Sequence, residues 1–339
     1  MKKILETEDS KYILLQKIGY GGTCSVYKGY CAEDKSHKLY AIKIFKPQNK
    51  KYFEREIFAN KILPPKYFLS VIKYGMGSIH QENINYSEMS ISEYISTMND
   101  DKLTGNIFYK IEEIAKNGEL FNYIYELGKG FSEQISAKIF STLIKTVKIL
   151  HENNIIHGDI KPENILIGND FSLKLIDFGF SRKINKNNNN IIYNTEGTET
   201  YSSPEITKAG NSGYDGIKSD IFSLGVLLFV ITIGRFPFNL SQYSDKKYRL
   251  IMTKKYDKYW AAYEKYNLSK EFKDLMNHLV CFNPNERFSI DEILEHSWIK
   301  KNVNYNGINK DNKEYDIYVD EDVVKELKER KDFMEKKTN

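Results

Sequence analysis

Short apolar runs separated by turn-forming residues open the chain. The three runs cover residues 12–15, 26–30 and 39–45. Glycines separate the first two runs, and charged residues separate the second from the third. Runs of this length, rich in β-branched and aromatic residues, are typical of strands. The pattern predicts a three-stranded antiparallel meander over residues 12–46.

A helical pattern follows the meander, and strands resume after it. We expect a helix at 51–63, a loop and strand at 67–79, and a strand at 107–112. Residues 80–106 are polar and uneven, and we interpret them as an insertion that is long for a loop. Both disorder and a short helix of its own are compatible with this composition.

The second half of the chain is mainly helical. An apolar stripe at every fourth position predicts an amphipathic helix, and it consists of Ile135, Ile139, Leu143 and Val147. Short strands are expected at 165–168 and 172–176, and helices from about 217 to 300. The pattern therefore predicts strands mainly in the first part of the chain and a helical character from residue 118.

The composition limits the classes of function. The chain has 339 residues, 41% of them hydrophobic, which is enough for a sizeable core. A net charge of +4 is too small to indicate nucleic acid as the main partner. The three cysteines are far apart, which favours a reducing cytoplasmic location over a secreted disulfide scaffold, with nuclear entry left open.

The longest apolar run is interpreted as a buried core helix. It extends from Ile221 to Ile233, is shorter than a bilayer span and contains polar residues. We therefore expect no membrane span. The N-terminal residues become acidic at Glu6, so we also expect no signal peptide.

One stretch carries the residue types that phosphoryl transfer requires. Residues 157–164 read His-Gly-Asp-Ile-Lys-Pro-Glu-Asn, and an Asp-Phe-Gly triplet follows from Asp177. Asp159 can accept the proton of an incoming hydroxyl, and Lys161 can neutralise charge on the phosphate. Asn164 and Asp177 offer hard oxygen ligands for Mg²⁺. Singly, each residue could be a cap, a surface charge or a turn, but their joint spacing favours catalysis.

Two features of the meander add to this chemistry. A glycine-rich turn at residues 19–25 could bring backbone N–H groups close to phosphates, although a plain hairpin turn explains it equally well. Lys43 is expected to point inward, where a lone ammonium is costly to bury. Glu56 on the next helix is its expected partner and Glu54 the alternative. Without the other motifs, two exposed charges would be the simpler interpretation.

Together these motifs resemble those of the eukaryotic protein kinase family over about residues 12–300. The resemblance implies a two-lobed α+β fold, with an N-lobe at about 12–114 and a C-lobe at about 115–300. A short leader at 1–11 and a charged tail at 301–339 would flank it. It also implies ATP and Mg²⁺ as cofactors, Asp159 and Lys161 as catalytic residues, and Asn164 and Asp177 as metal ligands.

The resemblance also assigns residues to ATP. Three of them, Val26, Ala41 and Leu166, would sandwich the adenine, and Cys24 replaces the third glycine of the phosphate-covering loop. The full expected set is Gly19, Tyr20, Gly21, Gly22, Thr23, Cys24, Val26, Ala41, Lys43, Glu56, Glu113, Ala115, Glu119 and Leu166. Glu112 would occupy the gatekeeper place before the hinge, where a carboxylate is unusual.

A later segment resembles the end of a kinase activation loop. It runs from Gly197 to Glu205, and the resemblance pairs Glu205 with Arg287 and ties Asp220 to the catalytic loop. Such features are typical of kinases that act on proteins. The expected substrate platform consists of Glu163, Thr198 and Glu205. Lys161 and Thr198 resemble the serine/threonine branch, and the C-terminal part looks like calcium/calmodulin-dependent and polo-like kinases.

The implied substrates are Ser/Thr hydroxyls of proteins. Glu119 and Glu163 match acids that receive basic substrate residues, whereas Val230 occupies another place where an acid can stand. A mild preference for basic peptides is therefore expected. The sequence does not determine the oligomeric state.

Gly158 departs from the family pattern, in which an arginine stands beside the catalytic Asp. A phosphate on the activation loop usually neutralises that arginine. Residues 184–194 contain no Ser or Thr, although Tyr193 and Thr195 lie close by. We hypothesise that activity does not require activation-loop phosphorylation, and the alternative is drift in a weakened enzyme. His157 is interpreted as a packing residue.

Two other functions are compatible with parts of the sequence. One is a catalytically weak pseudokinase that acts as a nucleotide-binding scaffold, and the other is a kinase-like enzyme for small molecules. The retained Lys43, Asp159, Asn164 and Asp177 argue against the first, and the peptide platform argues against the second. The tail has a thin apolar face, which favours a solvated end or a loosely docked helix.

Overall fold

The computed structural model describes residues 2–64, 67–82, 105–185, 189–193, 195–208, 212–303 and 320–338. The chain divides into two compact units, Met1–Ala115 and Lys116–Asn339. Each unit has hydrophobic clusters of its own. Most of the predicted insertion at 80–106 lies outside the described residues, and its two ends belong to strands.

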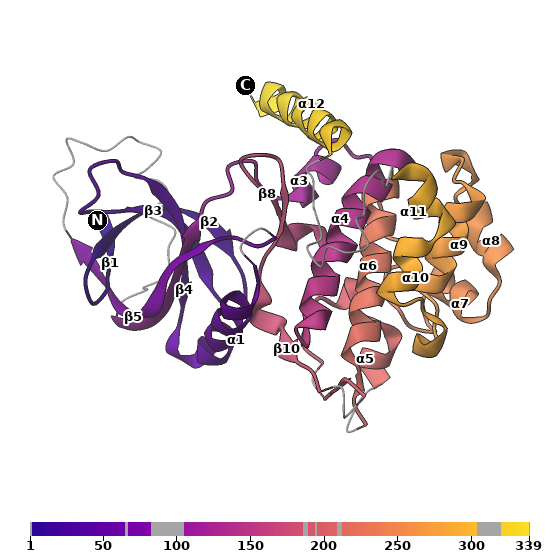
Figure 1. Cartoon of the computed structure of the whole chain (residues 1–339), viewed down its shortest axis with the longest axis horizontal. Coiled ribbons are helices and arrows are strands. Elements are labelled where there is room, and N and C mark those ends of the chain that lie inside the picture. Colours follow the sequence, from indigo (N-terminus) through magenta and orange to yellow (C-terminus); the bar gives the residue numbers. More distant parts are fainter. Residues whose placement is uncertain are drawn as a thin grey trace, which may run out of the picture. The chain divides into compact units, whose positions relative to one another are not determined.

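The described residues of the N-terminal unit form a closed antiparallel barrel (Figure 1). Its strands are β1 (Lys2–Glu6), β2 (Lys11–Tyr20), β3 (Ser25–Cys31), β4 (Leu39–Phe45), β5 (Val71–Glu82) and β6 (Gly105–Glu113). They follow the order β1-β2-β3-β4-β6-β5, and pairing of β1 with β5 closes the sheet. The predicted meander, formed by β2, β3 and β4, is confirmed.

Strand β1 was not predicted. It lies in the segment interpreted as a leader, and its five residues include two lysines, so they carry only a weak strand pattern. Long-range pairing determines this strand, because β1 pairs with β2 on one side and with β5 on the other. Intrinsic strand propensity is weak evidence where such tertiary pairing decides.

The alternation of side chains separates two faces of the barrel wall. Ile42 and Ile44 of β4 belong to the interior cluster, with Tyr109 and Ile111 of β6. Since successive side chains of a strand point to opposite faces, Lys43 belongs to the outer face. There, Phe45 packs with Phe53 and Ile57 of helix α1 (Lys50–Ile62). The outer face next to α1 is therefore itself buried.

The C-terminal unit is mainly helical (Figure 1). Its helices are α3 (Leu120–Tyr125), α4 (Glu133–Glu152), α5 (Pro204–Lys208), α6 (Gly216–Ile233), α7 (Lys246–Met252), α8 (Tyr256–Ala261), α9 (Lys270–Leu279), α10 (Ile290–Glu295), α11 (Ser297–Asn302) and α12 (Glu321–Thr338). Three short strand pairs accompany them: β7 (Ile155–Ile156) with β10 (Arg182–Lys183), β8 (Ile165–Ile167) with β9 (Leu173–Leu175), and β11 (Ile191–Ile192) with β12 (Tyr214–Asp215). The α+β class that the family resemblance implied is confirmed.

Helices α4 and α6 form the centre of this unit. Ser132 caps α4 by accepting a hydrogen bond from the Ile135 backbone N–H. The predicted stripe continues on the buried face through Ile139, Leu143 and Val147. By length and composition alone, α6 could cross a membrane, but nearly all its residues are buried inside the unit. The prediction of a core helix is confirmed.

The tail ends in a helix that packs on the C-terminal unit. Val323 and Leu327 of α12 are buried, and Arg330 is only 4% exposed. The Arg330 guanidinium donates to the backbone carbonyls of Tyr123, Lys129 and Gly130. Residues 320–338 are thus a docked helix and not a solvated end.

Candidate active site

The loop that carries Asp159 is fixed to the core by Asp220 of α6. One carboxylate oxygen of Asp220 accepts from the His157 backbone N–H at 2.9 Å, and the other accepts from the Gly158 N–H at 3.0 Å. The first oxygen also lies 2.9 Å from the His151 ring. This is the tie predicted between the long core helix and the loop.

His157 is a packing residue, as predicted. Its ring is fully buried against Phe178, with 5.2 Å between the ring centroids. One ring nitrogen lies 3.0 Å from the Ile176 carbonyl, and the other accepts from the Asp159 backbone N–H at 3.2 Å. The ring therefore holds the loop against the segment that leads to Asp177.

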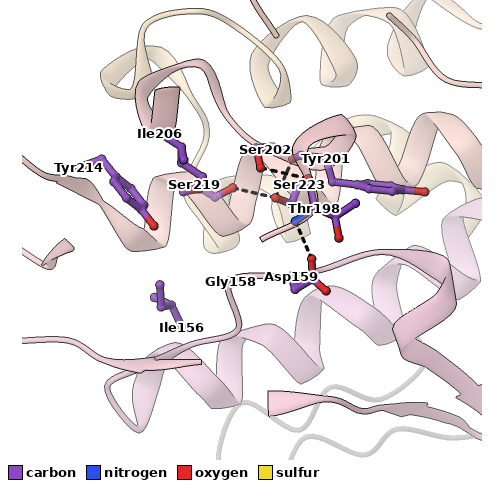
Figure 2. Close-up of a pocket in the computed structure, with 10 residues that line it drawn as sticks. All are labelled: Ile156, Gly158, Asp159, Thr198, Tyr201, Ser202, Ile206, Tyr214, Ser219 and Ser223. Carbon is purple, nitrogen blue, oxygen red and sulfur yellow. Dashed lines mark hydrogen bonds between the residues drawn. The ribbon is translucent and has the colours of Figure 1, made fainter. Parts of the chain in front are cut away.

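The Asp159 carboxylate is surrounded by donors. Lys161 Nζ lies 2.8 Å from Oδ2, Asn164 Nδ2 donates to the same oxygen at 3.0 Å, and the Thr198 N–H donates to Oδ1 at 2.9 Å. Figure 2 shows the Thr198 contact. Burial alone would raise the pKa of Asp159, but the ion pair with Lys161 and these hydrogen bonds lower it below its usual value. The carboxylate is therefore ionised and able to accept a proton.

The two candidate metal ligands are Asn164, in the same loop, and Asp177, in the Asp-Phe-Gly triplet after it. The Ile176 N–H donates to the Asn164 carbonyl at 2.9 Å, which connects the two segments. Asp177 has left-handed backbone angles, and its carboxylate accepts from the Gly179 N–H. Among the described residues no cluster of three or more His, Cys, Asp or Glu side chains forms a complete cage. The donor set fits Mg²⁺, which usually takes one or two carboxylates together with substrate phosphates.

Gly158 adopts a left-handed backbone with φ of 77°, and a Cβ there would come 2.9 Å from the Phe180 carbonyl. A small pocket lies beside it (Figure 2). Its lining residues are Ile156, Gly158, Asp159, Thr198, Tyr201, Ser202, Ile206, Tyr214, Ser219 and Ser223. They include no lysine or arginine, so the lining supplies no cation for a phosphate.

Arg182 on β10 is paired within the same segment. Its guanidinium donates to the carbonyls of Phe180 and Ser181, both at 2.8 Å, and forms an ion pair with Glu196. Strand β10 pairs with β7, whose last residue immediately precedes His157. The sequence reasoning missed this contact, because neither residue belongs to a motif that it used.

The platform pair is also as predicted. Arg287 is buried, and its two terminal nitrogens donate to the two carboxylate oxygens of Glu205 at 2.5 and 2.7 Å. The Arg287 Nε and one terminal nitrogen also donate to the backbone carbonyls of Cys281 and Lys218. Such a bidentate pair fixes orientation as well as charge. It anchors the end of the segment that contains Thr198.

Two acids, Glu119 and Glu163, lie close together, and Glu163 also lies near Tyr201. Burial raises the pKa of Glu163, and burial together with the neighbouring Glu163 raises the pKa of Glu119. Among the described residues, Glu163 Oε2 and the Tyr201 hydroxyl are buried side-chain atoms that have no hydrogen-bond partner. A buried carboxylate oxygen without a donor is suited to receive one from a ligand.

The glycine-rich turn of the N-terminal unit connects β2 and β3. The Gly21 N–H donates to the Cys24 carbonyl at 3.1 Å. A Cβ on Gly21 or Gly22 would meet no atom within 4 Å, so the backbone here is open to a ligand. Asn49 holds the turn through the Thr23 carbonyl at 2.6 Å. Cys24 is half-buried against the cluster of Phe45, as expected for a small apolar residue.

Lys43 pairs with Glu56, the expected partner, at 3.1 Å from each carboxylate oxygen. The alternative, Glu54, lies near Lys50 at the surface. Two further charges, Lys110 and Glu112, share the same buried space. Glu112 was expected only as an unusual residue at the gatekeeper place, and no role was predicted for Lys110. Lys110 and Glu112 flank Ile111 and so share one face of β6, but only the pairing of β6 with β4 places that face beside Lys43.

The other residues assigned to ATP fall into two groups, one in each unit. In the N-terminal unit, Ala41 is buried on β4, and the Glu113 carboxylate accepts from the Ser70 N–H at 3.0 Å. In the C-terminal unit, Leu166 on β8 forms an isolated bridge with Glu119. Their contacts with a nucleotide stay predictions.

Comparisons with known proteins agree with this geometry. The family described as Protein kinase domain matches residues 12–299. The chain is 35% identical over 195 residues to the serine/threonine-protein kinase kin-29 of Caenorhabditis elegans, covering 57% of this chain and 22% of that protein. It is 31% identical over 266 residues to CBL-interacting protein kinase 14 of Oryza sativa subsp. japonica, covering 77% of this chain and 58% of that protein. It is also 31% identical over 234 residues to CBL-interacting serine/threonine-protein kinase 15 of Arabidopsis thaliana, covering 69% of this chain and 53% of that protein. The chain thus spans less than two thirds of the length of each of these relatives.

Proposed function

The chain belongs to the protein kinase domain family, and from this premise we propose that it transfers the γ-phosphate of ATP to Ser or Thr hydroxyls of proteins. The observation that carries the proposal is the Asp159 site. An ionised, buried carboxylate is held by Lys161, Asn164 and the backbone of Thr198. An aspartate in such a setting can accept the proton of a hydroxyl beside a transferring phosphate.

Each residue has a distinct role in this reaction. The substrate hydroxyl loses its proton to Asp159 as its oxygen bonds to phosphorus, and the bond from phosphorus to the ADP oxygen breaks. Lys161 offsets the negative charge on the transferred group. Asn164 and Asp177 would hold Mg²⁺, which neutralises the phosphates when it is bound. Lys43, held by Glu56, would contact the other phosphates.

The direct test is phosphate transfer from ATP and Mg²⁺ to a generic basic protein, with Asp177→Ala as the control. A wild-type signal no higher than that control would favour the nucleotide-binding scaffold instead. A peptide array would then define the acceptor. We expect Ser and Thr acceptors with basic residues nearby, because the unpartnered Glu163 oxygen and Glu119 form an acidic pair.

We also propose that the enzyme works without a phosphorylated activation loop. Glu196 already supplies a carboxylate to Arg182, and Arg182 lies on the strand paired with the residues before the catalytic loop. Gly158 provides no second cation, and neither does the pocket beside it. The permanent charge of Glu196 therefore takes the role that a phosphate has elsewhere.

This makes a specific prediction for the loop. Thr195→Ala and phosphatase treatment should each leave the transfer rate unchanged, since Thr195 is exposed and is not part of the Arg182–Glu196 ion pair. Glu196→Gln should lower the rate by about tenfold, because it replaces a charged hydrogen bond of about 1.5–3 kcal/mol with a neutral one of about 0.5–1.5 kcal/mol. Initial rates on one peptide measure all three. Loss of most activity in both the Thr195→Ala and the phosphatase-treated samples would contradict the proposal.

A further inference from the structure

Four charged side chains are buried together between the barrel wall and α1. They are Lys43 on β4, Glu56 on α1, and Lys110 and Glu112 on β6, and none is more than 4% exposed. The set contains two cations and two anions, so its net charge is zero. Buried charges persist when they are paired in this way.

The strand register places two lysines side by side, and an anion between them allows both to be buried. Lys43 and Lys110 are directly opposite each other on the antiparallel pair β4–β6. Like charges in this position destabilise a sheet unless an anion separates them. Glu56 supplies that anion, with Lys43 Nζ at 3.1 Å and Lys110 Nζ at 2.8 Å from Oε2. Burial would raise the pKa of Glu56, but the two ammonium groups lower it to about 2.

Glu112 creates a competition for Lys43. Its Oε2 lies 2.7 Å from Lys110 Nζ, and its Oε1 lies 3.9 Å from Lys43 Nζ. The shorter contact keeps Glu112 on Lys110. If Lys110 lost its charge, Lys43 would be the remaining cation of the four for two buried carboxylates. An ammonium held between two carboxylates is a poorer ligand for phosphate, since its charge is already neutralised.

We propose that Lys110 is a positioning residue for Lys43: by pairing with Glu112 and sharing Glu56, it keeps Glu112 at 3.9 Å from the Lys43 ammonium and so holds that ammonium in the position from which it would contact nucleotide phosphates. The inference rests on the proposed function, in which Lys43 binds ATP. Glu112, a carboxylate that is unusual at the gatekeeper place, thereby has Lys110 as its partner. It also makes the effect of Lys110 depend on Glu112.

The test is a set of variants titrated with a fluorescent ATP analogue and Mg²⁺, at a temperature where each is folded. Lys110→Met should weaken nucleotide affinity by about tenfold, whereas Lys110→Arg, which keeps the charge, should bind like the wild type. The double variant Lys110→Met/Glu112→Leu removes the competing carboxylate and should recover affinity. Lys46→Met is the matched control, since Lys46 is exposed just beyond the end of β4. If Lys110→Met does not fold, Lys110→Gln replaces it with the same expectation.

Two results would overturn the inference. One is wild-type affinity in Lys110→Met, and the other is a double variant that melts like the wild type yet binds as weakly as the single one. A merely structural role would make affinity follow melting temperature across the set, which the melting curves reveal. Failure of the proposed function is a separate result: the wild type would bind ATP but transfer no more phosphate than Asp177→Ala. A wild type that binds no nucleotide would overturn both.

Discussion

Replacing Asp159 by Asn is expected to lower the rate of phosphate transfer by about 10²- to 10⁴-fold, the range that a general base contributes. Asn has the same shape and can still accept the hydrogen bond from the Thr198 N–H. It cannot accept the hydroxyl proton, and it leaves Lys161 without its 2.8 Å ion pair. The defect should therefore appear in kcat, with nucleotide affinity little changed.

The measurement is single-peptide kinetics for the wild type, Asp159→Asn and a matched control. Asp170→Asn is suitable, because Asp170 is an exposed carboxylate in the turn after β8 that contacts Ser172. A small loss of stability in Asp159→Asn is expected near neutral pH, because the lowered pKa shows that folding favours the ionised form. Transfer by Asp159→Asn at more than about a tenth of the wild-type rate would show that another group accepts the proton.

Replacing Arg330 by Met should destabilise the C-terminal unit by on the order of 3 kcal/mol, because three backbone carbonyls lose their donor. The guanidinium also lies 3.7 Å above the Phe131 ring, and that contact would be lost. For a unit of this size the melting temperature should fall by roughly 6–12 °C. Lys336→Met, on the exposed side of the same helix, should have no effect.

Removal of residues 320–339 should have a larger effect in the same direction. It would expose the surface that Val323 and Leu327 cover, and it would break the contact of Lys331 with Asn117 near the start of α3. We expect lower stability and no gain of activity. A truncated chain that transfers phosphate faster than the full chain would show instead that α12 inhibits the enzyme.

Much of the fold and of the catalytic loop could be predicted from the sequence, because short motifs and local periodicity carry them. The pairs Lys43–Glu56 and Glu205–Arg287 were also predicted, since both partners lie in motifs. Lys110 and the Arg182–Glu196 pair were missed because their partners are brought close only by strand pairing and loop packing. Arg330 was missed for another reason: it lies on the same helix face as the buried Val323 and Leu327, but a charged side chain is normally expected to be exposed.

The closed barrel has a consequence for how other proteins can bind the N-terminal unit. Because β1 joins β2 to β5, every described strand of the barrel has a neighbour on both sides. An open sheet edge exposes backbone groups to which a foreign peptide can add as an extra strand. Among the described residues, β1 covers that edge only along Lys11–Leu14 of β2 and Ser78–Glu82 of β5, and the rest of these two strands has a paired strand on one side only. A peptide that adds to this unit as an extra strand would therefore have to pair with those remaining segments of β2 or β5.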